Sequence, residues 1–319
     1  MVQSSKKDCT FSMKKILKIL AIILLIALAV EGAFYVAYLI KWKDAIKTQW
    51  DNGNKVIMKY SLPTPFSPDE TAYTWHNRIF EKKNSKKRPL AVVGCSFAEG
   101  SCLEDNQILG YKLSDLSNRT VYQRGVTGTG LSYVYYQIDN KLIPTADKSP
   151  EYIIYVFIFD HLFRLYQHQV GFWSTEINLR YENKDGKIQE VKEFLPFYNK
   201  FYTAKYLQED IANRKGEIES QNYALFKPML TSMMKIAKQN YPNSKIVFLE
   251  YPQSDEKWCV LSEDAKKFIK DEGYIYVNAN ELVGDQLGKR EYKVKGEWLH
   301  PNEKAWDLVA PKLAKLLKL

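Results

Sequence analysis

The sequence predicts an α/β protein: a three-layer α/β/α domain with a mostly parallel sheet, preceded by one N-terminal transmembrane helix. An apolar segment near the N-terminus carries a single charge. From residue 89 onward, short β-rich runs alternate with longer helical stretches, which is typical of βαβ units. Several of these runs are continuously apolar, as expected for parallel strands that helices cover on both faces.

The composition narrows the class of protein. The chain has 319 residues, of which 45% are hydrophobic and 26% charged, so a disordered or collagen-like chain is excluded. Four cysteines in a chain of this length are too few for a disulfide-built scaffold. The 46 basic and 37 acidic residues give a formal net charge of +9.

Residues 19–40 form the predicted transmembrane helix, in which Glu31 is the only charge. At about 1.5 Å per residue, its length is roughly 33 Å, enough to cross a bilayer core. Lysines cluster in residues 1–18, which predicts a cytoplasmic N-terminus and places the rest of the chain outside the cytoplasm. Glu31 either faces a partner helix or marks the end of the membrane segment.

A cleaved signal peptide is the alternative to an anchor. Ala27-Leu28-Ala29 resembles a small-x-small cleavage site after an apolar run, and cleavage there would give a secreted protein. The apolar character resumes at Ala33, which favours the anchor.

Residues 41–87 are predicted to form a stalk, because they are polar, charged and contain Pro63, Pro65 and Pro68. A basic run at the end of this stretch suits an anionic lipid or wall polymer. Nucleic acid is not an expected partner, because no groove-reading motif is present.

Residues 88–319 are predicted to form the α/β domain. The expected strands are Leu90–Gly94, Thr120–Gln123, Tyr152–Phe159, Lys245–Tyr251 and Tyr274–Val277. The expected helices are Leu109–Leu116, Leu131–Leu142, Ala224–Gln239, Glu263–Asp271 and Asn302–Leu317.

Residues 163–215 interrupt the alternation as an insertion, with a hairpin turn predicted at residues 183–187. The insertion either shapes a substrate site or is a structural flap.

The first motif is Gly94-Cys95-Ser96, which follows the first buried strand and leads into a helix. This arrangement puts a hydroxyl at the carboxyl edge of the sheet, close to backbone N–H groups that can stabilise an oxyanion. Taken alone, the motif favours a structural turn or an N-cap over a catalytic serine.

The second motif is the glycine-rich run 124–130 after the second strand. Its three glycines allow close approach of the backbone to a ligand. The spacing of a dinucleotide-binding loop is absent, so an anion or oxyanion loop is expected and no cofactor is implied.

The third motif is Glu297-x-x-His300, directly before the last helix. A carboxylate three residues before a histidine can orient the ring and stabilise its protonated form. Taken alone, a single histidine near a helix start favours a solvated or hydrogen-bonded residue without a catalytic role.

Together, these three motifs resemble the blocks of the SGNH/GDSL hydrolase family over about residues 89–315, excluding the insertion. The resemblance implies a flavodoxin-like strand order and an ester hydrolase. It matches Ser96 to the nucleophile, Gly128 to the oxyanion-hole glycine, His300 to the base and Glu297 to the triad acid.

The chain departs from the family pattern in three places. Cys95 stands where the family usually has Asp, which makes Cys95 an alternative nucleophile. Glu297 replaces Asp and is one methylene longer. Phe159 stands in place of the third-block Asn, so Asp160, His161 or Arg164 takes over part of its role, or the oxyanion hole has only two donors.

The expected function is a membrane-anchored serine esterase that removes acyl groups from a cell-envelope glycan through Ser96, His300 and Glu297. Asp160 and His161 are further candidates for substrate or oxyanion contact. An O-acyltransferase for a surface polysaccharide and a catalytically impaired glycan-binding or assembly protein, acting with envelope-polymer partners, are the alternatives.

No metal site is expected, because the sequence has no CxxC pair or His/Cys cluster. If the domain is exported, Cys95, Cys102 and Cys259 lie outside the cytoplasm. A Cys95–Cys102 or Cys102–Cys259 bridge is compatible with the sequence, and spacing alone does not select one.

Overall fold

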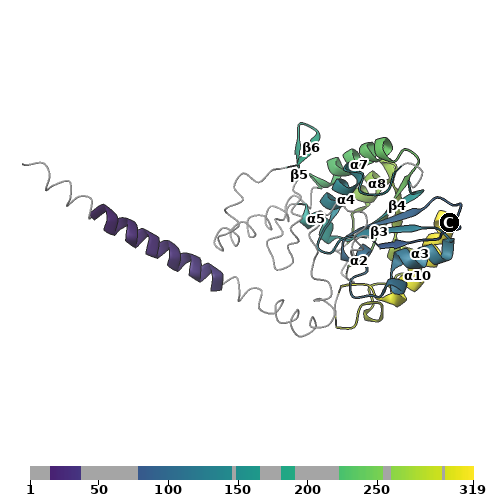
Figure 1. Cartoon of the computed structure of the whole chain (residues 1–319), viewed down its shortest axis with the longest axis horizontal. Coiled ribbons are helices and arrows are strands. Elements are labelled where there is room, and N and C mark those ends of the chain that lie inside the picture. Colours follow the sequence, from purple (N-terminus) through teal and green to yellow (C-terminus); the bar gives the residue numbers. More distant parts are fainter. Residues whose placement is uncertain are drawn as a thin grey trace, which may run out of the picture.

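The computed structural model describes residues 15–36, 78–145, 149–165, 181–190, 223–253, 260–296 and 299–319 (Figure 1). Several predictions concern residues outside these ranges. They include the lysine cluster before residue 15, most of the predicted stalk, much of the insertion, Glu297 and Cys259.

The N-terminal apolar segment is helical over Lys15–Val36, drawn in purple in Figure 1. This helix has 22 residues and a mean hydropathy of 2.6, and it is long and apolar enough to cross a membrane. A signal sequence has the same properties, so length and composition alone do not choose between the two. The helix begins before the predicted start at residue 19, while residues 37–40 lie outside the described part of the chain.

The domain is built on a six-stranded sheet with the order β1-β3-β2-β4-β7-β8. The strands are β1 (Arg78–Phe80), β2 (Leu90–Gly94), β3 (Val121–Gly125), β4 (Tyr152–Phe157), β7 (Lys245–Glu250) and β8 (Ile275–Asn278). All neighbours pair in parallel except β1 with β3. Without β1, the parallel strands follow the flavodoxin-like order that the family resemblance implies, with its switch point beside β2.

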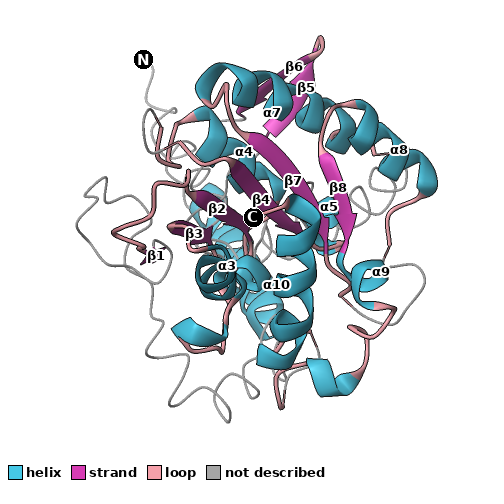
Figure 2. Cartoon of the chain, turned by 90° about the vertical axis from the view of Figure 1, so that its right-hand side faces the viewer, coloured by secondary structure: helices cyan, strands magenta, loops and turns pink. Residues whose placement is uncertain are grey.

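Helices cover both faces of the sheet and form the predicted three layers (Figures 1 and 2). One face carries α4 (Leu131–Asp139), α7 (Phe226–Asn240) and α8 (Glu263–Asp271). The other carries α2 (Ser96–Glu99), α3 (Leu109–Ser117), α9 (Ala279–Val283) and α10 (Glu303–Leu317). A further short helix, α5 (Asp160–Arg164), follows β4.

The central strands are buried on both faces, as the continuous apolar runs predict. In β4, Ile153 and Tyr155 face one hydrophobic cluster, while Ile154 and Val156 face the other, and all four are fully buried. Burial of each aliphatic side chain contributes about 1.5–3 kcal/mol. A covered strand of this kind has no polar face, so only its ends offer polar groups for a site.

The ordered domain begins earlier than predicted. Arg78–Phe80 falls inside the predicted stalk, yet it pairs with β3 as the antiparallel edge strand β1. The Arg78 side chain is buried, and its guanidinium donates hydrogen bonds to the Asp105 carboxylate at 2.8 Å and to the Glu99 carbonyl. A three-residue strand shows no periodicity, so the sequence pattern did not reveal it. The structure therefore corrects the stalk prediction at Arg78–Phe80, which belong to the sheet.

The insertion contains the predicted hairpin, formed by β5 (Tyr181–Lys184) and β6 (Lys187–Glu190). Asp185 and Gly186 make its turn with positive φ angles of 52° and 78°, as a two-residue hairpin requires. Tyr181 is buried in the core, with its ring 5.0 Å from that of Tyr135.

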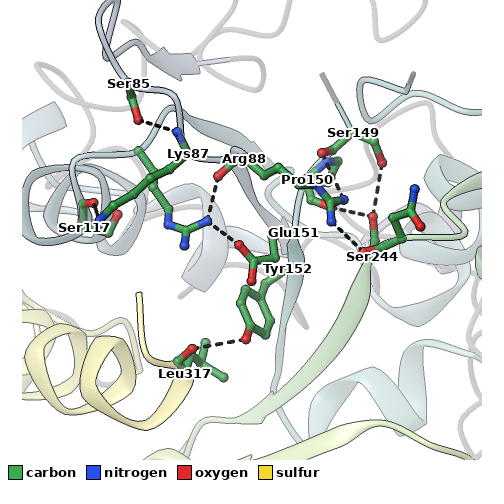
Figure 3. A network of polar contacts seen from close by, with 12 residues as sticks. Ser85, Lys87, Arg88, Ser117, Ser149, Pro150, Glu151, Tyr152, Ser244 and Leu317 are labelled. Atoms are coloured by element: carbon green, nitrogen blue, oxygen red, sulfur yellow. Dashed lines mark hydrogen bonds and ion pairs between the residues drawn. The ribbon is translucent and has the colours of Figure 1, made fainter. Parts of the chain in front are cut away.

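The amino ends of the central strands are tied together by a polar network (Figure 3). Arg119 bonds the Glu151 carboxylate and the Arg88 carbonyl. The Tyr152 hydroxyl donates to the Leu317 carbonyl at 3.1 Å, which secures the end of α10. These contacts stabilise the edge of the sheet opposite to Ser96.

Candidate active site

Ser96 lies at the carboxyl end of β2, as the first residue of α2. Gly94 makes the turn possible: its φ is +142°, and a Cβ there would lie 2.7 Å from the Val156 carbonyl oxygen. Gly100 then ends α2 in the left-handed conformation with φ 78°. The strand end and these two glycines present the Ser96 hydroxyl at the edge where ligands bind in parallel α/β sheets.

His300 is held opposite Ser96 by the loop before α10. The Val294 N–H donates to the His300 carbonyl at 2.9 Å, and Lys293 forms a bridge with Pro301. Asn302 caps α10 through its side-chain oxygen. The backbone on both sides of His300 is therefore fixed before the ring meets any substrate.

The structure brings the predicted pair together, because His300 Nε2 lies 2.8 Å from Ser96 Oγ. The Phe97 ring packs 5.1 Å from the His300 ring and limits its rotation. A hydroxyl within hydrogen-bond reach of an imidazole is the arrangement for a base-activated nucleophile. Glu297, the predicted triad acid, lies outside the described residues.

The glycine-rich loop after β3 packs directly against α2. A Cβ on Gly125 would lie 2.2 Å from the Glu99 nitrogen, so only glycine permits this contact. The Val126 N–H donates to the Gly94 carbonyl at 2.9 Å. Gly128 adopts φ +77° within this loop, beside the helix that carries Ser96.

A buried carboxylate joins α2 to this loop, and the sequence motifs did not reveal it. Glu99 is 5% exposed and accepts hydrogen bonds from the Thr127 hydroxyl and, at 3.1 Å, from the Ser101 hydroxyl. The two hydroxyl oxygens also lie 2.8 Å apart. Glu99 thus fixes Thr127, the neighbour of Gly128. Glu99 and Thr127 lie 28 residues apart in sequence, so only the folded structure identifies the role of Glu99.

At the end of β4, Asp160 and Arg164 brace the same loop. Arg164 Nη1 donates to the Thr129 carbonyl at 2.6 Å, and its other terminal nitrogen lies 3.4 Å from the Asp160 carboxylate. The Asp160 N–H donates to the Gln253 side chain at 3.0 Å. In this arrangement Asp160 acts on the loop through Arg164, with no described contact to Ser96 or His300.

His161 does not have the predicted substrate contact. Its side chain is fully buried, its Nδ1 lies 2.7 Å from the Tyr155 hydroxyl, and its ring stacks on that of Tyr155. Burial, together with the Arg164 charge, holds the pKa of His161 well below its usual value. It is a neutral histidine of the core, so this prediction was wrong.

Cys95 is a poor nucleophile in this structure. The thiol is free and fully buried, and burial raises its pKa although the Arg164 charge opposes the shift. A thiol without access to solvent and with a raised pKa supplies little thiolate. The Cys95–Cys102 bridge is absent, and Cys259 lies outside the described residues.

The described residues contain no group of three or more His, Cys, Asp or Glu side chains that could hold a metal ion. The polar side chains around Ser96 instead act on one another and on the glycine-rich loop. The Ser96 hydroxyl beside the His300 imidazole can offer nucleophilic attack and proton transfer.

No protein-family model and no curated protein matches the chain. Solved structures that resemble it include a member of the lipolytic protein G-D-S-L family from Veillonella parvula, with 11% identity over 73% of this chain and 99% of that chain and a TM-score of 0.42. Phospholipase A1 from Streptomyces albidoflavus has 12% identity over 72% of this chain and 98% of that chain, with a TM-score of 0.38. The acetyl xylan esterase Est2A from Butyrivibrio proteoclasticus has 12% identity over 73% of this chain and 64% of that chain, with a TM-score of 0.36.

Proposed function

We propose that the protein is a serine ester hydrolase that removes acyl groups from a carbohydrate polymer. The observation that carries the proposal is the 2.8 Å contact between Ser96 Oγ and His300 Nε2. Such a contact at the carboxyl edge of a parallel sheet places the nucleophile where substrates bind.

In the proposed reaction, His300 Nε2 takes the Ser96 proton while Ser96 Oγ forms a bond to the ester carbonyl carbon. The ester C–O bond then breaks, and the alcohol leaves with the proton that His300 returns. Water deprotonated by His300 attacks the acyl-enzyme, which releases the acid and restores Ser96. Glu297 is proposed to orient the His300 ring.

The oxyanion is proposed to bind the N–H groups of Ser96 and Gly128. N–H groups of the first helical turn have no partner within the helix, and Ser96 is the first residue of α2. Gly128 belongs to the loop that Glu99 and Arg164 brace from two sides. A donor held rigid before the reaction needs no reorganisation when the charge develops.

We further propose that the helix Lys15–Val36 anchors the chain and that the hydrolase domain lies outside the cytoplasm. The preceding lysines support this orientation. A domain at the outer face of a membrane meets envelope glycans, which is why we propose an acylated carbohydrate as the substrate. An acyltransferase would use a sugar hydroxyl in place of water in the second step.

The test uses the full chain in a neutral detergent with p-nitrophenyl acetate as the substrate. Ser96→Ala and His300→Ala should each abolish hydrolysis, and a fluorophosphonate probe should label wild type at Ser96. Ser85→Ala is the matched control, because Ser85 lies near the opposite edge of the sheet and bonds the Lys87 N–H. Equal hydrolysis by wild type and Ser96→Ala would overturn the proposal.

A further inference from the structure

A cavity of about 520 Å³ adjoins the loop that carries His300. One wall comes from the segment that follows the Ser96 helix and includes Leu103 and Gln107. The other wall comes from the chain on both sides of His300, at residues 290–291, 293–296 and 302–304. Each wall is thus continuous in sequence with one of the two proposed catalytic residues.

The charge in this cavity is positive. Arg290, Lys295 and Lys304 line it, and no ion pair among the described residues engages these three side chains. Glu291 also lines it, so these three positive charges and one negative charge leave a surplus of two among the described lining residues. A surplus of this kind in a hollow attracts anions and raises their local concentration.

The two other ionic groups of the lining already have partners. Glu303 accepts a hydrogen bond from Gln107 at 3.2 Å and lies 3.7 Å from the Lys112 ammonium. Lys293 is 6% exposed and directs its ammonium to the carbonyls of Pro252 and Gln253 at 3.5 and 3.4 Å. Neither group changes the surplus charge that faces a ligand.

The backbone of the cavity is preformed. The Asn302 amide donates to the carbonyls of Glu291 and Lys293 at 2.7 and 2.9 Å, which closes the loop that carries His300. Among the described lining residues, Leu103 and Val294 are the aliphatic ones, so these residues offer an acyl chain few apolar contacts. The lining suits a charged, hydrated segment better than a lipid tail.

We propose that this cavity is a subsite for the anionic backbone of the substrate, a carbohydrate polymer that carries carboxylate or phosphate groups. The inference rests on the proposed function and gives its substrate class. Anionic groups bound by Arg290, Lys295 and Lys304 hold the chain while an ester further along it reaches Ser96. Because single exposed ion pairs are weak, several anionic groups must bind together.

The first experiment measures binding of unacetylated oligogalacturonate to the full chain at low salt by titration calorimetry. Arg290→Gln/Lys304→Gln should weaken binding about tenfold, the effect of losing two exposed ion pairs. The control Lys235→Gln/Lys238→Gln removes the same charge from exposed positions on α7, on the other face of the sheet, and should bind like wild type. Equal weakening by both double variants would show a non-specific charge effect and overturn the proposal.

Two further probes separate other sources of the same anionic chemistry. Inorganic phosphate should compete only weakly, because it offers one anionic group. Vesicles of phosphatidylglycerol should not displace oligogalacturonate. Tight binding of phosphate alone, or displacement of oligogalacturonate by the vesicles, would overturn the assignment to a polymer.

The last experiment compares acetate release from acetylated polygalacturonate and from neutral acetylated xylan. The ratio of kcat/KM for the acidic over the neutral polymer should fall about tenfold in Arg290→Gln/Lys304→Gln, through KM. Ser96→Ala should still bind oligogalacturonate. If the wild-type protein binds oligogalacturonate but cleaves no ester, the proposed function fails while the anion site stands. If the wild-type protein and the double variant each cleave both polymers equally well, the subsite fails alone.

Discussion

His300 Nε2 and Ser96 Oγ lie 2.8 Å apart, although 204 residues separate them in sequence. The strand order explains the contact. β2 is an inner strand, and α10 crosses the face that also carries α2 and α3. The loop before α10 therefore reaches the carboxyl end of β2. A strand-to-helix turn and a helix-to-helix loop far apart in the chain thus form one site.

Replacing Gly128 by alanine should reduce kcat/KM for p-nitrophenyl acetate by about 10²–10³, the usual cost of losing one oxyanion donor. Gly128 has φ +77°, where an L-residue is strained by about 1–2 kcal/mol, so the loop should shift its N–H. Gly273→Ala is the matched control, because Gly273 has φ +95° with open space around it and precedes β8. Comparable losses in both variants would contradict a role for Gly128 in the oxyanion hole.

Thr127→Val should lower kcat about tenfold while leaving KM nearly unchanged. The substitution removes the hydroxyl that donates a hydrogen bond to the buried Glu99 carboxylate. Leaving that carboxylate oxygen without this bond costs about 1–3 kcal/mol of stability. The loop that carries Gly128 then loses its link to the Ser96 helix. Thr127→Ser should restore kcat, since it restores the hydroxyl. A variant that lowers only the melting temperature would show that Thr127 is structural and does not position the loop.

His161 should make the folded state less stable as the pH falls. Its folded pKa lies well below its unfolded value of about 6.5, so below that pH only the unfolded state takes up the proton. The free energy of unfolding should therefore decline by up to about 1.4 kcal/mol per pH unit below pH 6.5. Urea unfolding at pH 7.5 and 5.5 measures this change. His161→Gln should remove this part of the slope, and parallel curves for the two proteins would refute the prediction.

The ion pair of Arg119 with Glu151 should stabilise the domain more than an exposed pair does. Arg119 is 8% exposed and also bonds the Arg88 carbonyl, so Arg119→Met should reduce the free energy of unfolding by about 1–3 kcal/mol. Lys82→Gln removes an exposed pair with Asp115 at 3.3 Å and should cost no more than about 1 kcal/mol. Chemical unfolding of both variants gives the comparison, and equal losses would contradict it.

The anchor predicts that the chain stays in the membrane fraction after an alkaline carbonate wash and keeps its full mass of 37.2 kDa. A helix of this hydropathy partitions stably into the bilayer. Deleting residues 1–36 should release the protein into the soluble fraction. A wild-type chain that is soluble and begins after Ala29 would show a cleaved signal peptide instead.

The sequence alone was sufficient for the layers of the fold and for the position of most elements. β2 and α8 have the predicted bounds, and the hairpin turn at Asp185 and Gly186 is where the sequence puts it. These features depend on neighbours within a few residues: continuous apolar runs, helix caps and residues that accept positive φ. A sequence reveals such features because the interacting residues are close neighbours along the chain and therefore meet in any fold.

The tertiary structure decided the distances and the environments. Glu99 meets Thr127, and Arg164 braces Thr129, through contacts between segments that are distant in sequence. The pairing of Arg78 with β3 is a contact of the same kind, so only the folded chain shows it. His161 follows a strand just as Ser96 does, yet one side chain is a buried core residue and the other meets His300. The sequence pattern predicts polar groups at the strand ends. Whether each group is buried, and which residue it pairs with, depends on the helix that covers the strand end. Packing between distant segments determines which helix that is.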